Sequence, residues 1–442
     1  MALKDLLLTP LYLPFILLLA VWLRRKMTDS VTRRYFMPAL FVKITGAVAL
    51  GLIYQFYYGG GDTFNFFHDS NLIWEAFLDD PFTGLELIVA DNQFHTGLYA
   101  YTSRMHFYVD PYTYQVIRLS AFLGLFTFHT YTLIAILFAF ISFTGVWALY
   151  KVFYDLYPHL HKQIALAVLF MPSVFFWGSG LMKDTVTLGA LGWLFHAFYF
   201  GVIRRRSLAV NGAMVVLCIL IIKAIKVYIL LCFLPAAFLW IFLEYRARIK
   251  SQALRFISLP LVILMAVPLS YQAIVKVTEE NKRYQLENIT NTTQVTATWL
   301  QQVGTMQSGS VYSLGEFDGT WTGMLSKAPQ AIFVTLYRPF LWESRNPVML
   351  LSALEAAFFF FMTLKMLWRV KLKHLGSLIG GQPLVLFCLL FAITFSFAVG
   401  VSSYNFGTLV RYKIPMMPFF LVALYVMQGQ AVKKRKKVRR FA

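Results

Sequence analysis

The residues best suited to catalysis begin with three glycines followed by an aspartate, Gly59 to Asp62. Glycine adopts backbone conformations that end a helix and let a ligand approach closely, and Asp62 would place a carboxylate at the start of the next helix. Asp69 follows, with His68 beside it, so the two carboxylates would share one face of a short helix about 10 Å apart. We predict that Asp62 and Asp69 are catalytic. A helix cap followed by solvated loop carboxylates explains the same spacing equally well.

Three later segments combine cations with acids or aromatic rings, each next to an apolar run. Lysine offers a compact cation for a phosphate, and arginine suits bidentate phosphate recognition. Tryptophan can stack on a sugar ring or anchor the chain at the membrane interface. A glycine-rich helix junction, interface anchoring and snorkelling of long cations are the plainer interpretations. The predicted substrate-binding residues are His68, Lys183, Asp184, Arg338, Trp342, Glu343, Arg345, Glu355, Arg411 and Lys413.

The elements that must position these residues are membrane spans. Of the 442 residues, 59% are hydrophobic and only 14% are charged, which is too apolar for a soluble protein of this length but suits a bilayer. Apolar runs of about 17–22 residues predict an all-α, polytopic transmembrane bundle of about eleven spans. The predicted spans are residues 5–23, 36–57, 128–149, 163–181, 185–203, 208–225, 227–243, 256–273, 348–367, 383–401 and 414–430.

Basic charge is distributed unevenly along the chain, whose 40 Lys and Arg and 20 Asp and Glu give a net charge of +20. Most Lys and Arg fall in connections that the spans place on one side of the membrane, together with only Asp29, Asp155 and Glu244. This excess indicates the positive-inside rule and not a nucleic-acid surface. It predicts a multi-pass protein of a bacterial inner (plasma) membrane, with the N-terminus outside and the C-terminus in the cytoplasm.

Two long connections interrupt the spans. Residues 58–127 are expected to form interfacial helices in the first large extracytoplasmic loop, because aromatic, semi-polar segments commonly lie at headgroup depth. Residues 274–347 are hydrophilic and are expected to form an extracytoplasmic loop or cap. The predicted organisation is an N-terminal extra span and cytoplasmic loop (1–35), a transmembrane core (36–273), the loop or cap (274–347), C-terminal spans (348–430) and a basic cytoplasmic tail (431–442).

The cysteines predict neither a disulfide framework nor a zinc site. Cys218, Cys232 and Cys388 lie in apolar spans and lack CxxC or Cys/His spacing. No metal ligand and no certain cofactor is predicted, and a divalent cation is left open. All four candidate segments are expected on the extracytoplasmic side, where acids and cations together can hold a polyprenyl-phosphate headgroup and deprotonate an acceptor hydroxyl.

A span that ends in an acidic first outer loop, Gly61-Asp62 to Asp69, followed by interfacial helices and a bundle, resembles the GT-C superfamily of membrane glycosyltransferases. The closing segment Arg411 to Pro415 is similar to a basic-then-proline segment of many bacterial members and of polysaccharide polymerases. The resemblance covers the layout from about residue 36 onward, and the extra span before the acidic loop departs from it. It implies a GT-C-like fold in which Asp62 or Asp69 is the catalytic base or a metal ligand.

The function implied by this resemblance is inverting transfer of a hexose or pentose on the extracytoplasmic face. The implied partners are a polyprenyl-phosphate-linked sugar donor, a glycan or lipid acceptor and membrane lipids, and no nucleic acid. One alternative is a Wzy-like polysaccharide polymerase or ligase, in which Arg338 and Arg411 would matter more than Asp62. A lipid-linked oligosaccharide transporter and a non-enzymatic envelope assembly component are two further alternatives.

Overall fold

The computed structural model describes residues 3–246, 287–306, 311–315, 319–370 and 381–441, together with positions 251, 272, 275, 276, 278, 285, 375 and 376. Within these residues all regular elements are helices, and the one β-contact is an isolated bridge between Val311 and Asn405. This confirms the predicted all-α class. The chain forms two compact units: unit 1 (Met1–Val152, Val168–Ala197 and Ala209–Lys226) and unit 2 (Phe153–Ala167, Phe198–Leu208 and Val227–Ala442).

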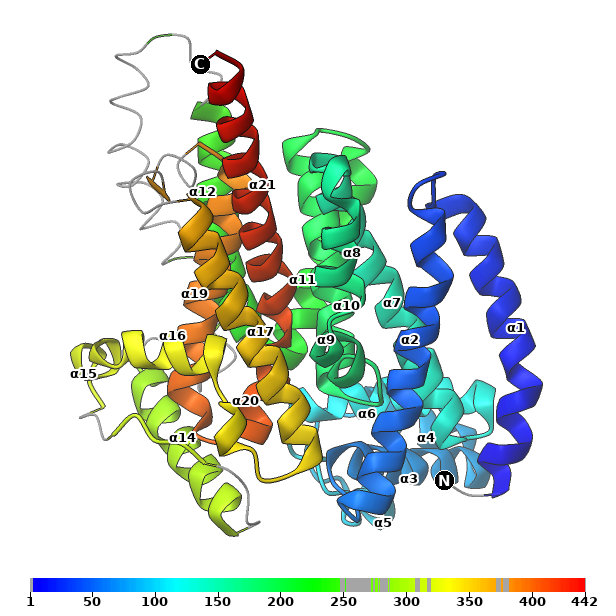
Figure 1. Ribbon diagram of the computed structural model, residues 1–442. Helices are drawn as coiled ribbons and strands as arrows, with labels where there is room; N and C mark the ends of the chain where they lie inside the picture. The colour runs from blue at the N-terminus through cyan, green and yellow to red at the C-terminus, as the bar shows by residue number, and fades with distance from the viewer. Residues whose placement is uncertain are drawn as a thin grey trace. The chain divides into compact units, whose positions relative to one another are not determined.

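Unit 1 contains the N-terminal helices. In Figure 1 the short helices α3 to α6 gather at the C-terminal end of α2. Its helices are α1 (Leu3–Met27), α2 (Arg33–Leu52) with the π-helical turn η1 (Ile53–Tyr57), α3 (Asp62–Asp79), α4 (Pro81–Val89), η2 (Thr96–Leu98), α5 (Tyr99–Thr102), α6 (Pro111–Thr127), most of α7 (Tyr131–Leu156), α9 (Pro172–Trp177), α10 (Lys183–Ala197) and α11 (Leu208–Lys226).

Unit 2 contains most of the C-terminal half. The long helices α12, α17, α19 and α21 run side by side, and α14 to α16 are grouped near one end of them (Figure 1). Its helices are η3 (Pro158–Leu160), most of α8 (His161–Leu169), η4 (Phe198–Ile203), α12 (Tyr228–Arg246), α14 (Ile289–Met306), α15 (Trp321–Ser326), α16 (Ala328–Tyr337), η6 (Leu341–Glu343), α17 (Pro347–Val370), α19 (Pro383–Ser403), α20 (Phe406–Tyr412), η7 (Ile414–Met416) and α21 (Met417–Phe441).

Nine helices in the described residues are long and apolar enough to cross a membrane. A chain with this many apolar helices is suited to a bilayer, which supports the predicted integral membrane protein. The orientation and the type of membrane stay predictions. The nine helices are Leu3–Met27, Arg33–Tyr57, Tyr131–Leu156, Lys183–Ile203, Leu208–Lys226, Tyr228–Arg246, Pro347–Val370, Pro383–Ser403 and Phe406–Gln430.

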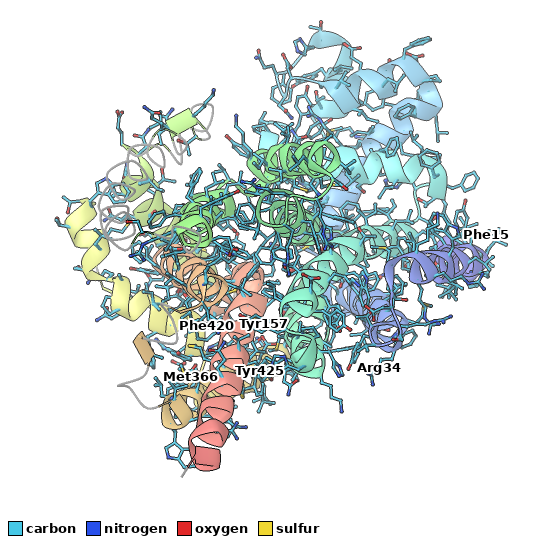
Figure 2. The ribbon with its side chains drawn as sticks, turned by 90° about the horizontal axis from the view of Figure 1, so that it is seen from above. Phe15, Arg34, Tyr157, Met366, Phe420 and Tyr425 are labelled. Atoms are coloured by element: carbon cyan, nitrogen blue, oxygen red, sulfur yellow. The ribbon has the colours of Figure 1, made fainter. Side chains whose placement is uncertain are left out.

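Helix α1 shows most directly why a bilayer is needed. Its apolar residues are largely exposed, including Phe15 at 67%, which points outward from the helix in Figure 2. Only Asp5, Ile16 and Ala20 are buried on α1. An apolar helix with so little buried surface would be costly in water and is stabilised when lipid covers it.

One predicted span does not have the expected form, and another lies outside the described residues. Residues 163–181 are divided into α8, which ends at Leu169, and α9, which begins at Pro172, because proline lacks an N–H and disfavours helical backbone in the residue before it. At 1.5 Å per residue, α8 and α9 rise only about 14 and 9 Å, which is short of a hydrocarbon core of about 30 Å. The predicted span 256–273 lies outside the described residues except for position 272, so the count of about eleven is not confirmed.

Close helix contacts in unit 1 depend on small residues. On α7 and α10, Gly145, Gly189 and Gly192 bring the two backbones into direct contact, and a methyl group at any of them would collide with backbone atoms of the facing helix. Gly46 on α2 touches the backbone carbonyl of Phe175 on α9 in the same way. Between helices in lipid there is no hydrophobic driving force, and small residues stabilise such crossings by allowing close van der Waals packing of the backbones.

The core of unit 2 is built largely from phenylalanine. Phe387 and Phe391 on α19 pack against Phe233 of α12 and Phe419 of α21, with ring centroids 4.9–6.0 Å apart. These rings are almost completely buried. Stacked and edge-on aromatic pairs stabilise beyond their buried area, so these rings stabilise the packing of α12, α19 and α21.

Candidate functional site

Three glycines set the position of Asp62. Gly59, Gly60 and Gly61 have φ values of 70°, 138° and 121°, which side chains rarely allow. They turn the chain out of η1 and directly into α3, whose first residue is Asp62. Asp62 is half-buried. The structure therefore places this carboxylate at a helix N-terminus, as the spacing predicted, where the helix dipole favours negative charge.

Asp69 lies two turns further along α3 and is completely buried. One carboxylate oxygen accepts a hydrogen bond from the backbone N–H of His106 and the other from that of Phe107, both at 2.9 Å. Asp69 Oδ1 also lies 3.2 Å from Nδ1 of His68. This carboxylate therefore fixes the segment between α5 and α6 against α3. It has no exposed surface of its own, but its partner His68 is exposed.

Two histidines flank the buried carboxylate on its solvent side. His68 and His106 are exposed, and their ring centroids are 4.9 Å apart. His106 was not among the predicted site residues, because it follows Asp69 after an irregular segment whose path the sequence does not define. One signal was available: the loop 58–127 carries His68, His95 and His106 in the region with the most acidic side chains.

Lys183 and Asp184 are next to each other in sequence but lie in different environments. Lys183 begins α10, and its Nζ donates to Thr113 Oγ1 at 2.7 Å, which connects α10 to the first turn of α6. Asp184 is 2% exposed and pairs with Lys226 of α11, itself 8% exposed, at 2.5 Å. Both side chains of this ion pair are therefore shielded from solvent.

In unit 2, Arg338 and Glu343 bind each other. Arg338 Nε lies 3.1 and 3.0 Å from the two carboxylate oxygens of Glu343, and the N–H of Phe340 donates to Glu343 at 2.7 Å. Burial alone would raise the pKa of Glu343, but the hydrogen bonds from Arg338 and Phe340 outweigh it and lower that pKa. The Arg338 guanidinium also lies over the Phe406 ring, 5.0 Å from its centroid.

Lys413 is buried beside this ion pair. Its Nζ donates to the carbonyl oxygens of Thr335 at 3.0 Å and Arg338 at 3.3 Å. The Thr335 carbonyl would normally accept from the residue four positions on, but that residue is Pro339, which has no N–H. Lys413 supplies the missing donor. The buried Glu355 is close enough to interact with its ammonium group.

The remaining predicted residues of unit 2 lie nearer the surface. Trp342 is 80% exposed and stacks on Phe340 with ring centroids 4.8 Å apart. Arg345 is exposed, and Arg411 is half-buried with its guanidinium over the Tyr412 ring. The structure thus brings Arg338, Glu343, Glu355 and Lys413 together in unit 2, whereas Trp342 and Arg345 are exposed at the surface.

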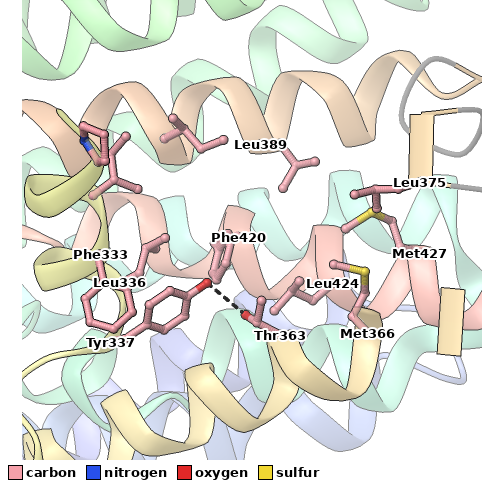
Figure 3. Close-up of a pocket in the computed structure, with 13 residues that line it drawn as sticks. Phe333, Leu336, Tyr337, Thr363, Met366, Leu375, Leu389, Phe420, Leu424 and Met427 are labelled. Carbon is pink, nitrogen blue, oxygen red and sulfur yellow. Dashed lines mark hydrogen bonds between the residues drawn. The ribbon is translucent and has the colours of Figure 1, made fainter. Parts of the chain in front are cut away.

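An apolar cavity of about 360 Å³ lies among four helices of unit 2, α16, α17, α19 and α21. Figure 3 shows Phe333, Leu336 and Phe420 lining it, and the Tyr337 hydroxyl hydrogen-bonded to Thr363. A second cavity of about 630 Å³ is lined by Arg338 and shares Pro329 and Phe333 with the first. An apolar cavity beside a cavity lined by an arginine could accommodate an amphipathic molecule.

The predicted residues therefore fall into two groups. Asp62, His68, Asp69, Lys183 and Asp184 belong to unit 1, whereas the predicted residues from Arg338 to Lys413 belong to unit 2. That the two groups share one pocket stays a prediction. No protein-family model, no curated protein and no solved structure matches the chain.

Proposed function

We propose that this chain is an integral-membrane glycosyltransferase that moves a hexose or pentose from a polyprenyl-phosphate donor to an acceptor hydroxyl, with Asp62 as general base. The observation that carries the proposal is the position of Asp62. A glycine turn at the end of the candidate span Arg33–Tyr57 delivers its half-buried carboxylate to the first residue of α3. A base at such a boundary suits an acceptor from water and a donor from lipid.

The proposed step is an inverting substitution at the anomeric carbon. The acceptor oxygen attacks that carbon, Asp62 takes the hydroxyl proton, and the bond from the anomeric carbon to the phosphate oxygen breaks. General-base assistance contributes about 10²–10⁴-fold to such a step. The departing phosphate carries the negative charge, and we assign its stabilisation to a cation, for which Lys183 of the same unit is the first candidate.

Two further features agree with a lipid-linked donor. The cavity lined by Phe333, Leu336 and Phe420 offers an apolar surface of the kind that an isoprenoid chain occupies. The adjoining cavity contains Arg338, and arginine suits phosphate recognition. These features support binding of a phosphate-bearing lipid by the chain, whereas the transfer reaction rests on Asp62.

The test is the variant Asp62→Asn in membranes that contain the full chain. A panel of polyprenyl-phosphate hexoses and pentoses with radiolabelled sugar serves as donor, and label in the glycan and lipid acceptor fractions is measured. We expect transfer to fall by about 10²-fold or more. Glu86→Gln, an exposed acid in the same loop, is the matched control and should keep full activity.

Transfer at the wild-type rate by Asp62→Asn protein contradicts the proposal. If transfer is lost instead in Arg411→Gln protein while Asp62→Asn protein stays active, the polymerase or ligase alternative is favoured. Arg411 is preferred to Arg338 for this comparison, because replacing Arg338 would leave the half-buried Glu343 without its arginine. Uptake of labelled lipid-linked glycan without transfer would favour the transporter alternative.

A further inference from the structure

His68, Asp69 and His106 place three ligand atoms of metal-binding type close together. One donor atom from each residue lies within 4.8 Å of the others, and the described residues contain no other such group of three or more His, Cys, Asp or Glu. The residues come from α3 and from the segment after α5, so the site depends on the fold and not on local sequence.

The observed spacing fits a small divalent ion. Two ligands about 2.0–2.1 Å from a tetrahedral zinc ion lie about 3.3 Å apart. The distance between His68 Nδ1 and Asp69 Oδ1 is 3.2 Å. An ion can therefore lie between these two atoms in place of their hydrogen bond, and the exposed His106 offers a third ligand atom within 4.8 Å of both.

The surroundings of Asp69 favour a ligand carboxylate. Each of its oxygens accepts one backbone N–H, from His106 or Phe107, which leaves further lone pairs on both. Hydrogen bonds of this kind orient a metal-binding carboxylate. The side chain of Asp69 is fully buried whereas that of His68 is 48% exposed, so the ion would be anchored from inside and open to water outside.

We propose that His68, Asp69 and His106 bind one divalent transition-metal ion, for which Zn²⁺ is the best match. Two histidines and one carboxylate are a frequent set of three protein ligands, and such sites keep a further position for water or substrate. The site rests on the geometry of unit 1 alone and not on the proposed transfer reaction. Asp62→Asn protein should therefore bind Zn²⁺ normally.

The experiment measures Zn²⁺ binding to the full chain in detergent micelles, after removal of any affinity tag and of metal with EDTA. Competition with a chromogenic chelator gives the affinity, and mass spectrometry gives the metal content. We expect one Zn²⁺ per chain. His68→Gln and His106→Gln should each weaken binding by more than about 100-fold, the upper end of what loss of an outer hydrogen-bond partner costs.

The matched control is His95→Gln. His95 lies 2.9 Å from Asp91 on the same loop, but this exposed pair has no third candidate ligand among the residues that the structure describes, so the variant should bind Zn²⁺ like the wild type. The two test variants keep Asp69 and its backbone hydrogen bonds, and size-exclusion elution confirms that they fold. The proposal is overturned if the wild-type chain binds no Zn²⁺, or if the His68→Gln His106→Gln double variant binds it as tightly as the wild type.

Discussion

Asp69 and Asp184 are both buried carboxylates of unit 1, yet they have different kinds of partner. Asp184 pairs with Lys226, and both side chains are shielded from solvent. Asp69 accepts two backbone N–H groups and contacts the exposed His68. The first arrangement is closed, whereas the second leads from a buried charge to the surface. Burial alone therefore does not show whether a carboxylate has a contact that reaches solvent, whereas the exposure of its partner does.

The largest expected effect comes from breaking the closed pair. Lys226→Met leaves Asp184 buried without its lysine, and removal of one partner of a buried ion pair costs about 3–5 kcal/mol. Thermal unfolding in detergent should show a large drop in the midpoint. The double variant Asp184→Leu Lys226→Met should recover most of it, because an apolar pair of similar volume often replaces an ion pair at little cost. An unchanged midpoint in Lys226→Met protein would contradict a structural role for the pair.

A smaller change in stability is expected from the protonation of His129, which contacts Ser70, the residue after Asp69. This side chain accepts from or donates to Ser70 of α3 at 3.0 Å, and burial, with a contribution from Lys4, lowers its pKa to about 3. The fold therefore favours neutral His129, so stability is fully present above about pH 6.5 and is lost as pH falls from there toward 3. The loss should be about 2 kcal/mol between pH 6.5 and 5.

His129→Gln keeps a polar group for Ser70 and removes this titration, so its unfolding midpoint should fall less between pH 6.5 and 5 than that of the wild type. His95→Gln, an exposed histidine, is the control and should follow the wild type. Equal pH dependence in all three proteins would show that His129 does not carry the acid sensitivity of this region.

The smallest effect is expected at the pair Asp91–His95. Both side chains are about half exposed, at 50% and 52%, and solvent screens their attraction. Asp91→Asn should leave the unfolding midpoint within experimental error. A clear decrease would show that exposure of the partner does not separate structural from available charges, which is the distinction drawn between Asp69 and Asp184.

The spans that the sequence predicts well are those with uninterrupted helices. Residues 348–367 and 383–401 were predicted, and the helices are Pro347–Val370 and Pro383–Ser403. The third span was predicted to end at 149, but α7 continues to Leu156. Its Lys151 pairs with Asp29 at 3.3 Å, a tertiary contact that hydropathy does not contain.

The site residues were predicted by type and loop, and their partners were not. Lys226 directly follows the predicted span 208–225, and its contact with Asp184 joins residues 42 positions apart. Lys413 was predicted to bind substrate. In the structure it is buried, and its Nζ donates to the Thr335 carbonyl, which Pro339 leaves without a helical donor. Such contacts depend on how the helices pack. A single sequence identifies the charged residues but not which of them lie next to each other.

The contact of Lys413 with Thr335 and Arg338 affects the order in which unit 2 can fold during synthesis. The carbonyl groups of Thr335 and Arg338 at the end of α16 accept hydrogen bonds from Lys413, which lies 78 and 75 residues further along the chain. During synthesis α16 is made well before α20, so its C-terminal turn stays incompletely bonded until the final span has inserted. Truncation before residue 406 should therefore loosen the end of α16 and the Arg338–Glu343 pair as well as removing the last helix.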